Sequence, residues 1–377
     1  MNINTTLKAT VAAAALFAVA VPVAEAGTVS NSSKMDVSLS GHMNKGMWYY
    51  NNGEDSGIYQ GDNGGSQTRA RIVAKGKINE AMSVTATTEW AMTASNESSL
   101  DPFDGVGATT NNGSESGTDS FFTIRHNYLT FAHKQFGTVK IGHTSEATDG
   151  ITEFGGVGNL QYGTSMLFGG SVSLVNSSTK ARATGTDLGE FRTAVDGGRS
   201  SAIAYATPSM GGFVATVSHT NEQNSAAEVR FGGKFGGIGV SAGIGYKNVN
   251  GSSTTQDAIW GGGIALSHDS GLAADFNYGK QKLVAGAGRT PTAWSVGLNY
   301  AADLSSMGKT TFRVAYSKAE DATAKNDEIT GYMVGAEQSV ADGVAVYAGY
   351  QHDSVDQAAG VSYDAVTTVF AGTKVVF

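Results

Sequence analysis

The sequence predicts an all-β fold, a transmembrane antiparallel β-barrel of about 16 strands with short turns at one rim and long loops at the other. Polar and apolar residues alternate in successive short segments along nearly the whole chain, and the last of them ends on Phe377. Short and long connections alternate between these segments. No helical pattern follows that could cover the apolar faces, so lipid is their expected surroundings.

Composition excludes several other classes. The chain has 377 residues, no cysteine, 51 glycines, 4 prolines and a net charge of −8. It lacks the runs of about 20 apolar residues that transmembrane helices need. Its 16 Phe, 14 Tyr and 4 Trp are too many for a disordered chain. The negative charge argues against a nucleic-acid partner, and no motif implies a cofactor or a metal site.

The first 26 residues read as a cleaved secretory signal. Lys8 precedes an apolar stretch from Val11 to Val23, and Ala24, Glu25 and Ala26 follow it. A basic start, an apolar centre and small residues around the cleavage site are typical of exported proteins. We therefore expect a signal peptide over 1–26 and a single barrel over 27–377.

The connections divide into two kinds. Short links rich in Gly, Asn and Asp are expected at Asn79–Ala81, Lys134–Gly137, Pro208–Gly212, Gly236–Gly237, Asp269–Gly271, Asp303–Gly308 and Ala341–Gly343. Longer polar loops are expected near 51–65, 93–119, 144–198, 220–227, 248–256, 281–291, 319–327 and 354–361. Turns at one rim and loops at the other indicate periplasmic turns and extracellular loops.

Residue parity separates a charged face from an uncharged one. Within 66–78, one face carries Arg69, Arg71, Lys75 and Lys77, and the other Ala70, Ile72, Ala74 and Ile78. Segment 121–132 fits least well, because Arg125 and Asn127 share parity with Leu129 and Phe131. A charge at mid-bilayer costs about 2–4 kcal/mol for Arg or Lys, so an uncharged face is expected to meet hydrocarbon. The charged face then encloses water, since a barrel of about sixteen strands is too wide for its own side chains to fill.

Aromatic residues gather near the segment ends, as expected for the two girdles of a membrane barrel. They include Trp48, Tyr49, Tyr50, Phe136, Tyr246, Trp260, Tyr300, Tyr316 and Phe377.

From Met35 to Phe377 the chain resembles the Gram-negative general diffusion porins. The likeness is carried by Phe136–His143, by Asp149–Gly156 and by Tyr205–Phe213, together with the terminal Phe377. His143 stands where the family usually has arginine, and Thr152 where enterobacterial members have proline.

The resemblance implies that the third long loop, about 144–198, folds back into the lumen and narrows it. Its acidic residues would be Asp149 and Glu153, and the basic residues opposite would be Arg71, Arg199, His42 and His143. Arg199 and His143 share parity with apolar neighbours, so a bend is needed to turn them inward. The parity of Arg69, Lys75, Lys77, Glu89 and Arg230 makes them ordinary wall charges.

Histidines are mostly uncharged near pH 7, so we expect a cation-leaning pore whose selectivity weakens towards pH 5. The insert 157–198 either narrows the channel further or lies over its mouth. The resemblance also implies a homotrimer in the outer membrane, surrounded by its lipid and inserted by the barrel-assembly machinery, that passes small hydrophilic solutes and ions.

Three alternatives remain. A substrate-specific channel for sugars or anions would need an aromatic or charged track, and inward parity shows few aromatics, Trp48 and Tyr347 among them. An enzyme is disfavoured, because the seven histidines are scattered and none lies in a catalytic motif. A structural barrel or adhesin would use its loops, and the hole would be incidental.

Overall fold

The computed structural model describes residues 27–31, 35–92, 96–97, 100–103, 122–155, 162–164, 168–250, 255–357 and 360–377. The predicted signal segment 1–26 lies outside the described residues, as does most of the predicted loop at 93–119. Within the described part, no helix is both long and apolar enough to cross a bilayer. Short helical turns there include η1 (Gly64–Ser66) and η3 (Leu188–Phe191).

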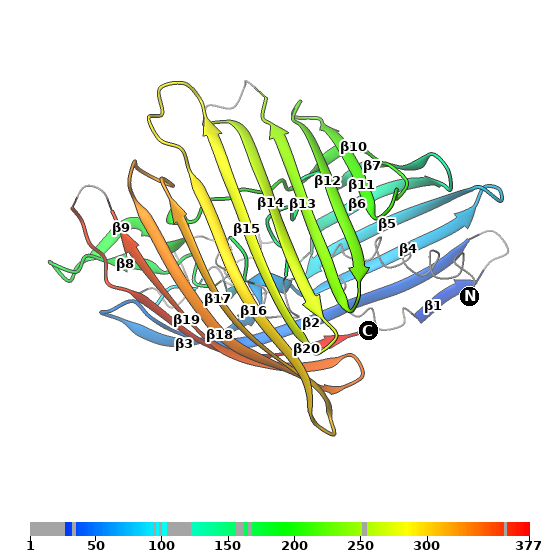
Figure 1. Cartoon of the computed structure of the whole chain (residues 1–377). Helices are drawn as coiled ribbons and strands as arrows, with labels where there is room; N and C mark the ends of the chain where they lie inside the picture. The colour runs from blue at the N-terminus through cyan, green and yellow to red at the C-terminus, as the bar shows by residue number, and fades with distance from the viewer. Residues whose placement is uncertain are drawn as a thin grey trace.

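Sixteen antiparallel strands close into a barrel, which confirms the predicted fold (Figure 1). They are β2 (Asp36–Asn51), β4 (Arg69–Lys77), β5 (Met82–Met92), β6 (Phe122–His133), β7 (Gly137–Ser145), β10 (Arg199–Ala206), β11 (Phe213–Thr220), β12 (Ser225–Phe235), β13 (Ile238–Asn248), β14 (Gln256–His268), β15 (Leu272–Leu283), β16 (Thr292–Ser305), β17 (Gly308–Glu320), β18 (Glu328–Ala341), β19 (Val344–Asp356) and β20 (Val366–Val376). Each pairs with its neighbour, and β20 closes the ring by pairing with β2, where Met43 lies opposite Val375.

Four further strands of the described chain lie outside this ring. β1 (Gly27–Asn31) and β3 (Ser56–Asp62) both pair with the long strand β2. β2 pairs with β4 over residues 36–42 and with β3 over 45–51, so β3 continues the wall beyond the end of β4. β8 (Ser173–Val175) and β9 (Arg182–Asp187) form a separate two-stranded sheet within the predicted third loop.

All seven predicted short turns join consecutive barrel strands. Glycine supplies the backbone geometry in several of them. Gly236 and Gly237, between β12 and β13, have φ of 52° and 89°, a region that other residues rarely adopt. The predicted loop at 220–227 is shorter than expected, because β12 already begins at Ser225.

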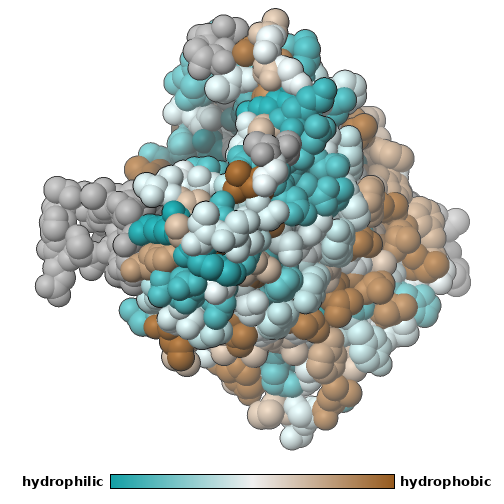
Figure 2. All heavy atoms as spheres, turned by 90° about the vertical axis from the view of Figure 1, so that its left-hand side faces the viewer, coloured by the Kyte–Doolittle hydropathy of each residue, from teal (hydrophilic) through white to brown (hydrophobic). Residues whose placement is uncertain are grey.

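The outer face of the barrel is apolar, as parity predicted. Large exposed apolar side chains recur at alternate positions, for example Ile141, Ile203, Val217, Val296 and Val334. Figure 2 shows hydrophobic residues gathered along the right flank and lower part of one face, and hydrophilic residues over its centre and upper part. An apolar surface of this extent is not tolerated by a water-soluble monomer, and a membrane barrel requires it.

The poor parity of segment 121–132 has a structural cause. The β5–β6 register shifts between Glu89 and Trp90, and Arg125 is the additional residue of this β-bulge. Ile124 before the bulge and Leu129 after it are both exposed on the outer face. The bulge therefore resets the alternation, and Arg125 faces the lumen.

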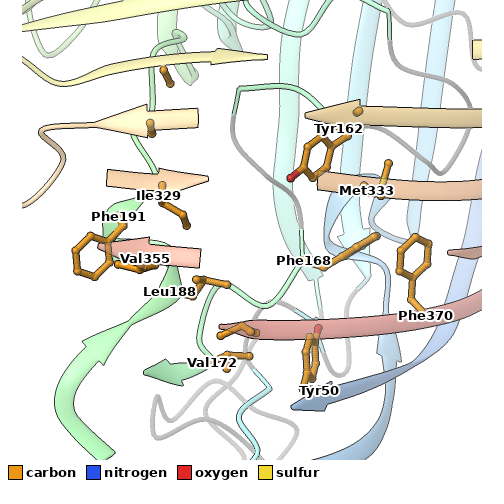
Figure 3. Packing of buried hydrophobic residues seen from close by; sticks show 14 of the residues in the cluster. Tyr50, Tyr162, Phe168, Val172, Leu188, Phe191, Ile329, Met333, Val355 and Phe370 are labelled. Atoms are coloured by element: carbon orange, nitrogen blue, oxygen red, sulfur yellow. The ribbon is translucent and has the colours of Figure 1, made fainter. Parts of the chain in front are cut away.

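The interior differs from the expected wide aqueous lumen. A cluster of buried apolar residues fills part of it, with contributions from the wall and from the insert (Figure 3). Trp48, Tyr347 and Phe370 project inward from the wall, and Phe168 and Leu188 come from the insert. Wall side chains alone cannot fill so wide a barrel, but a folded-in segment can. Several side chains of the insert therefore pack against the inner wall, while its β8–β9 hairpin lies at the connection between β19 and β20.

Candidate functional site

The loop that follows β7 crosses the lumen and docks on the inner wall of β15. The backbone N–H of Phe154 donates to Oδ1 of Asn277 at 2.9 Å, and Nδ2 of Asn277 donates to the Phe154 carbonyl at 3.0 Å. The side-chain amide thus satisfies both backbone groups of one loop residue, as a neighbouring strand would.

A buried ion pair fastens the next part of this loop. Arg313 on β17 has no exposed side-chain surface and binds Asp275 on β15 through both carboxylate oxygens, at 2.7 and 3.1 Å. The same guanidinium donates to the carbonyls of Gly155 at 2.8 Å and Tyr162 at 2.7 Å. One arginine therefore links the wall to Gly155 and to Tyr162, two described residues of the loop.

A row of inward glycines makes room for the loop. A Cβ on Gly243 would lie 2.9 Å from Ile151, and one on Gly279 would overlap Val195. Loop atoms are similarly close at Gly245, Gly261, Gly263 and Gly331. Glycine within a strand commonly marks such a close approach. These positions let the loop lie directly against the backbone of the wall.

Carboxylates gather on the lumen side of the loop. Burial, followed by the like charge of Asp149, raises the pKa of Glu153. Asp196 accepts two hydrogen bonds from Thr152, from its backbone N–H and its hydroxyl, both at 2.8 Å. Burial and the nearby charge of Glu153 raise the pKa of Asp196 to about 7. The loop therefore presents three acidic groups, one of which is half-protonated at neutral pH.

Arginines gather on the wall opposite. Glu89 on β5 is buried and pairs with Arg71, with Arg125 at 3.0 Å and with Arg69 at 3.7 Å. Three guanidinium groups around one carboxylate leave an excess of positive charge. Arg71 retains 43% of its side-chain surface in contact with solvent, so part of that charge meets the channel water.

Arg199, at the start of β10, and His143, near the end of β7, lie close to Arg125 of this basic wall. Pairing between β6 and β7 ends at Asn127 and His143, and β7 ends two residues later. A cavity of about 350 Å³ lies there, and Arg125, His143, Arg199 and Gln67 are among its lining residues. The charge of Arg199 acts on Glu153 across the passage.

His42, the last of the predicted basic residues, and the wall charge Arg230 lie at the edges of the site. His42 is buried on β2, and its Nε2 lies 2.8 Å from the Gln67 carbonyl, so it supports the wall and is not exposed to the passage. Arg230 on β12 donates to the Asp149 carbonyl at 2.9 Å and to Glu228 at 2.8 Å. It anchors the start of the loop.

The charge of Arg199 acts on Glu153, which lies close to Asp149, and Arg71 belongs to the arginine group around Glu89. Sequence reasoning left Arg69, Arg125 and Glu89 out of the site, and it did not single out Asp196. The sequence did carry a signal for Arg125: the alternation of polar and apolar residues is interrupted at this position, as a β-bulge would cause.

Within the described ranges, no group of three or more His, Asp or Glu side chains is placed to hold a metal ion. Fixed charges of opposite sign across a narrow water-filled space can orient water and sort solutes by charge.

A sequence profile of the Gram-negative porins matches residues 9–358. The chain belongs to this family. No curated protein is matched significantly by sequence. The agreement of the family with the barrel identifies the chain as an outer-membrane diffusion channel.

Solved structures share the fold at low identity. OmpT of Vibrio cholerae, with its loop L8 deleted, aligns with a TM-score of 0.59 and 16% identity, over 92% of this chain and 100% of that one. An anion-selective porin from Comamonas acidovorans aligns with a TM-score of 0.58 and 14% identity, over 91% of this chain and 100% of that one. OmpF of Salmonella typhi, in complex with daunomycin, aligns with a TM-score of 0.56 and 14% identity, over 93% of this chain and 100% of that one.

Proposed function

We propose that this porin passes small hydrophilic solutes and ions by passive diffusion between the loop carboxylates Asp149 and Glu153 and the wall arginines Arg71 and Arg199. It performs no catalysis. The observation that supports this is the arrangement of opposite charges on two rigid supports, the docked loop and the β4–β6 wall. Fixed charges of this kind act on a solute without binding it tightly.

We propose a weak preference for cations above neutral pH. Arg69, Arg71, Arg125 and Arg199, set against Glu89, leave three net positive charges on the wall. Three carboxylates on the loop balance them when all are ionised. The overall charge of −8 then makes the electrostatic potential in the channel negative, which favours cations over anions.

General diffusion fits the lumen better than a sugar-specific track. A track needs aromatic faces that a passing solute can touch. The inward aromatics Trp48 and Phe370 pack against Phe168 of the insert, Tyr347 is bonded to Asn44 and Asn63, and all three are nearly inaccessible.

The mature protein in this proposal is a homotrimer, surrounded by outer-membrane lipid, that has lost residues 1–26 and was inserted by the barrel-assembly machinery. One similar structure, OmpT of Vibrio cholerae, is described in a trimer form. Mass determination of the protein extracted from outer membranes, intact and after denaturation, tests both the cleavage and the subunit number.

Planar-bilayer recording of the purified protein tests the channel itself. Discrete conductance steps, with liposome-swelling rates that fall smoothly as solute size increases, are the expected result. A single saturable solute would instead indicate a specific channel. Absence of steps from correctly folded protein would exclude the proposal.

A further inference from the structure

The inner faces of the two halves of the barrel differ in their access to water. Polar side chains on β15–β20 point inward but are fully buried, among them Asn277, Ser295, Ser317, Gln351 and Thr368. On the opposite half, Arg71 and Arg230 keep 43% and 29% of their side-chain surfaces exposed. Polar residues on an inner wall meet water unless something covers them.

Phe154 of the docked loop covers Asn277, and the larger covering body is the segment 168–195, which we call the plug. Its apolar side chains pack against the wall, and Figure 3 shows Phe168 beside Phe370, and Leu188 between Val355 and Val172. The rings of Phe168 and Phe370 lie 4.6 Å apart, and those of Phe168 and Trp48 lie 6.0 Å apart. Phe191 and Val195 belong to the same cluster.

Hydrogen bonds hold the plug along its length. Gln351 donates to the Phe168 carbonyl at 3.1 Å, and Arg192 donates to the same oxygen at 2.6 Å. Gln281 donates to the Ala194 carbonyl at 2.5 Å, and Asn52 to the Ser173 carbonyl at 3.0 Å.

The plug is also attached at the end that carries β8 and β9. Asn176 forms an antiparallel bridge with Tyr363, in the connection between β19 and β20. Lys180 pairs with Asp364 at 2.8 Å. The attachment therefore spans the plug from its beginning at Phe168 to its hairpin.

The burial of these side chains argues for a fixed position. Phe168, Val172, Leu174, Leu188 and Phe191 are all essentially inaccessible. Removal of apolar side chains from water is the main favourable contribution to packing of this kind. Movement of the plug out of the lumen would expose all of them at once.

We infer that residues 168–195 form a permanent partition that closes the half of the lumen bounded by β15–β20 and β2. Solutes then pass only along the inner face of β4–β7 and β10–β12. This inference rests on the proposed diffusion function, and it restricts the solutes to small hydrated ions and compact polar molecules. Long or bulky solutes that a fully open barrel of this strand number would admit are excluded.

The natural absence of cysteine allows a direct test. Thr216→Cys places a thiol on the open side. Ser317→Cys and Thr368→Cys place near-isosteric thiols at fully buried inward positions, and Thr368 pairs with Gln351, which bonds the plug. A charged methanethiosulfonate reagent is added to the folded protein, and modification is followed by mass. We expect Thr216→Cys to react within minutes and the two buried thiols about 100-fold more slowly, until the protein is denatured.

The mass readout does not depend on conductance, so failure of the channel proposal and failure of the partition are distinguishable. Equal reaction rates on the two sides would overturn the partition. In bilayer recordings, modification of Thr216→Cys should lower the conductance, and reagent applied to Ser317→Cys should leave it unchanged.

A disulfide tests whether the plug moves during conduction. Asn176 and Tyr363 form a non-hydrogen-bonded antiparallel pair, as the bonds from Ser177 to Ser362 and from Asp364 to Val175 show. Such pairs have Cα atoms about 4.5 Å apart, within disulfide range. The oxidised and reduced forms of Asn176→Cys/Tyr363→Cys should conduct equally. Channels that open only after reduction would show that the plug must move, and would overturn the proposal.

Discussion

Arg313 connects three parts of the molecule through one side chain. It neutralises Asp275 and donates to the carbonyls of Gly155 and Tyr162. Asn299 accepts a further bond from it at 2.8 Å. The guanidinium is fully buried. Its loss would therefore leave the Asp275 carboxylate without a counter-charge and the two loop carbonyls without a hydrogen-bond donor.

Replacement of this arginine should therefore be strongly destabilising. Arg313→Met leaves Asp275 as an isolated buried charge, and removal of one partner from such a pair typically costs about 3–5 kcal/mol. We expect a lower unfolding midpoint in urea and faster proteolysis of the loop in detergent-folded protein. The double variant Arg313→Met/Asp275→Leu removes both charges and should recover part of the loss. A double variant less stable than the single one would contradict the isolated-charge explanation.

The site residues that sequence reasoning missed share a physical cause. Arg125 was obscured because a bulge reverses parity, and a single sequence does not show on which side of the bulge a residue falls. Asp196 lies 47 positions after Asp149 in the chain and reaches the site only through its bonds to Thr152. Contacts between such distant residues depend on how the loop packs, and packing leaves no periodic signal.

At the level of elements, the seven turns and the alternation within strands were predictable because both depend on local chemistry. Turn residues fix the backbone angles, and the two faces of a strand meet different solvents. The plug was not predictable, because its apolar residues belong to no periodic element. The glycine row of β13–β15 was a signal for the docked loop instead, since its inward glycines lie against Thr148, Ile151, Thr152 and Phe154, and only Val195 of the plug reaches it.

That row can be tested by adding a single methyl group. In Gly279→Ala the new Cβ would overlap Val195, so the loop must shift or the strand must bend. We expect a loss of about 1–3 kcal/mol, as for other overpacked interiors, and altered channel conductance. Gly198→Ala is the matched control, because nothing lies within 4 Å of the position that its new methyl group would take. Equal behaviour of the two variants would argue against close docking.

The whole barrel depends on contact between its outer face and hydrocarbon. Leu298 lies at the middle of β16 and is 50% exposed on that face. Leu298→Arg should reduce the free energy of folding into bilayers by about 2–4 kcal/mol, measured by urea titration in lipid vesicles. Leu304→Arg, at the strand end and 62% exposed, should cost about 1 kcal/mol or less. Similar costs at the two depths would contradict the placement of the membrane belt.

Selectivity of the whole channel should depend on pH through its loop. Above pH 8 Asp196 is largely ionised, because its pKa is about 7, and the negative charge of the loop is then largest. As pH falls through about 7, Asp196 takes up a proton, because burial and Glu153 have raised its pKa to about 7. The pKa of Glu153 is also raised, so part of its charge is lost at lower pH as well. The arginines stay charged throughout, and the passage becomes more positive.

The ratio of potassium to chloride permeability should therefore fall between pH 8 and pH 5. Loss of one charge about 8 Å from the path changes ion energies by about 0.5 kcal/mol in water, of opposite sign for the two ions, which gives roughly threefold after screening. Reversal potentials across a KCl gradient measure this ratio. Asp196→Asn should show the lower ratio already at pH 8 and a weaker pH dependence. Asp269→Asn, in an exposed turn beside Lys234, should behave as wild type. A ratio that rises on acidification would show that the loop carboxylates do not govern selectivity.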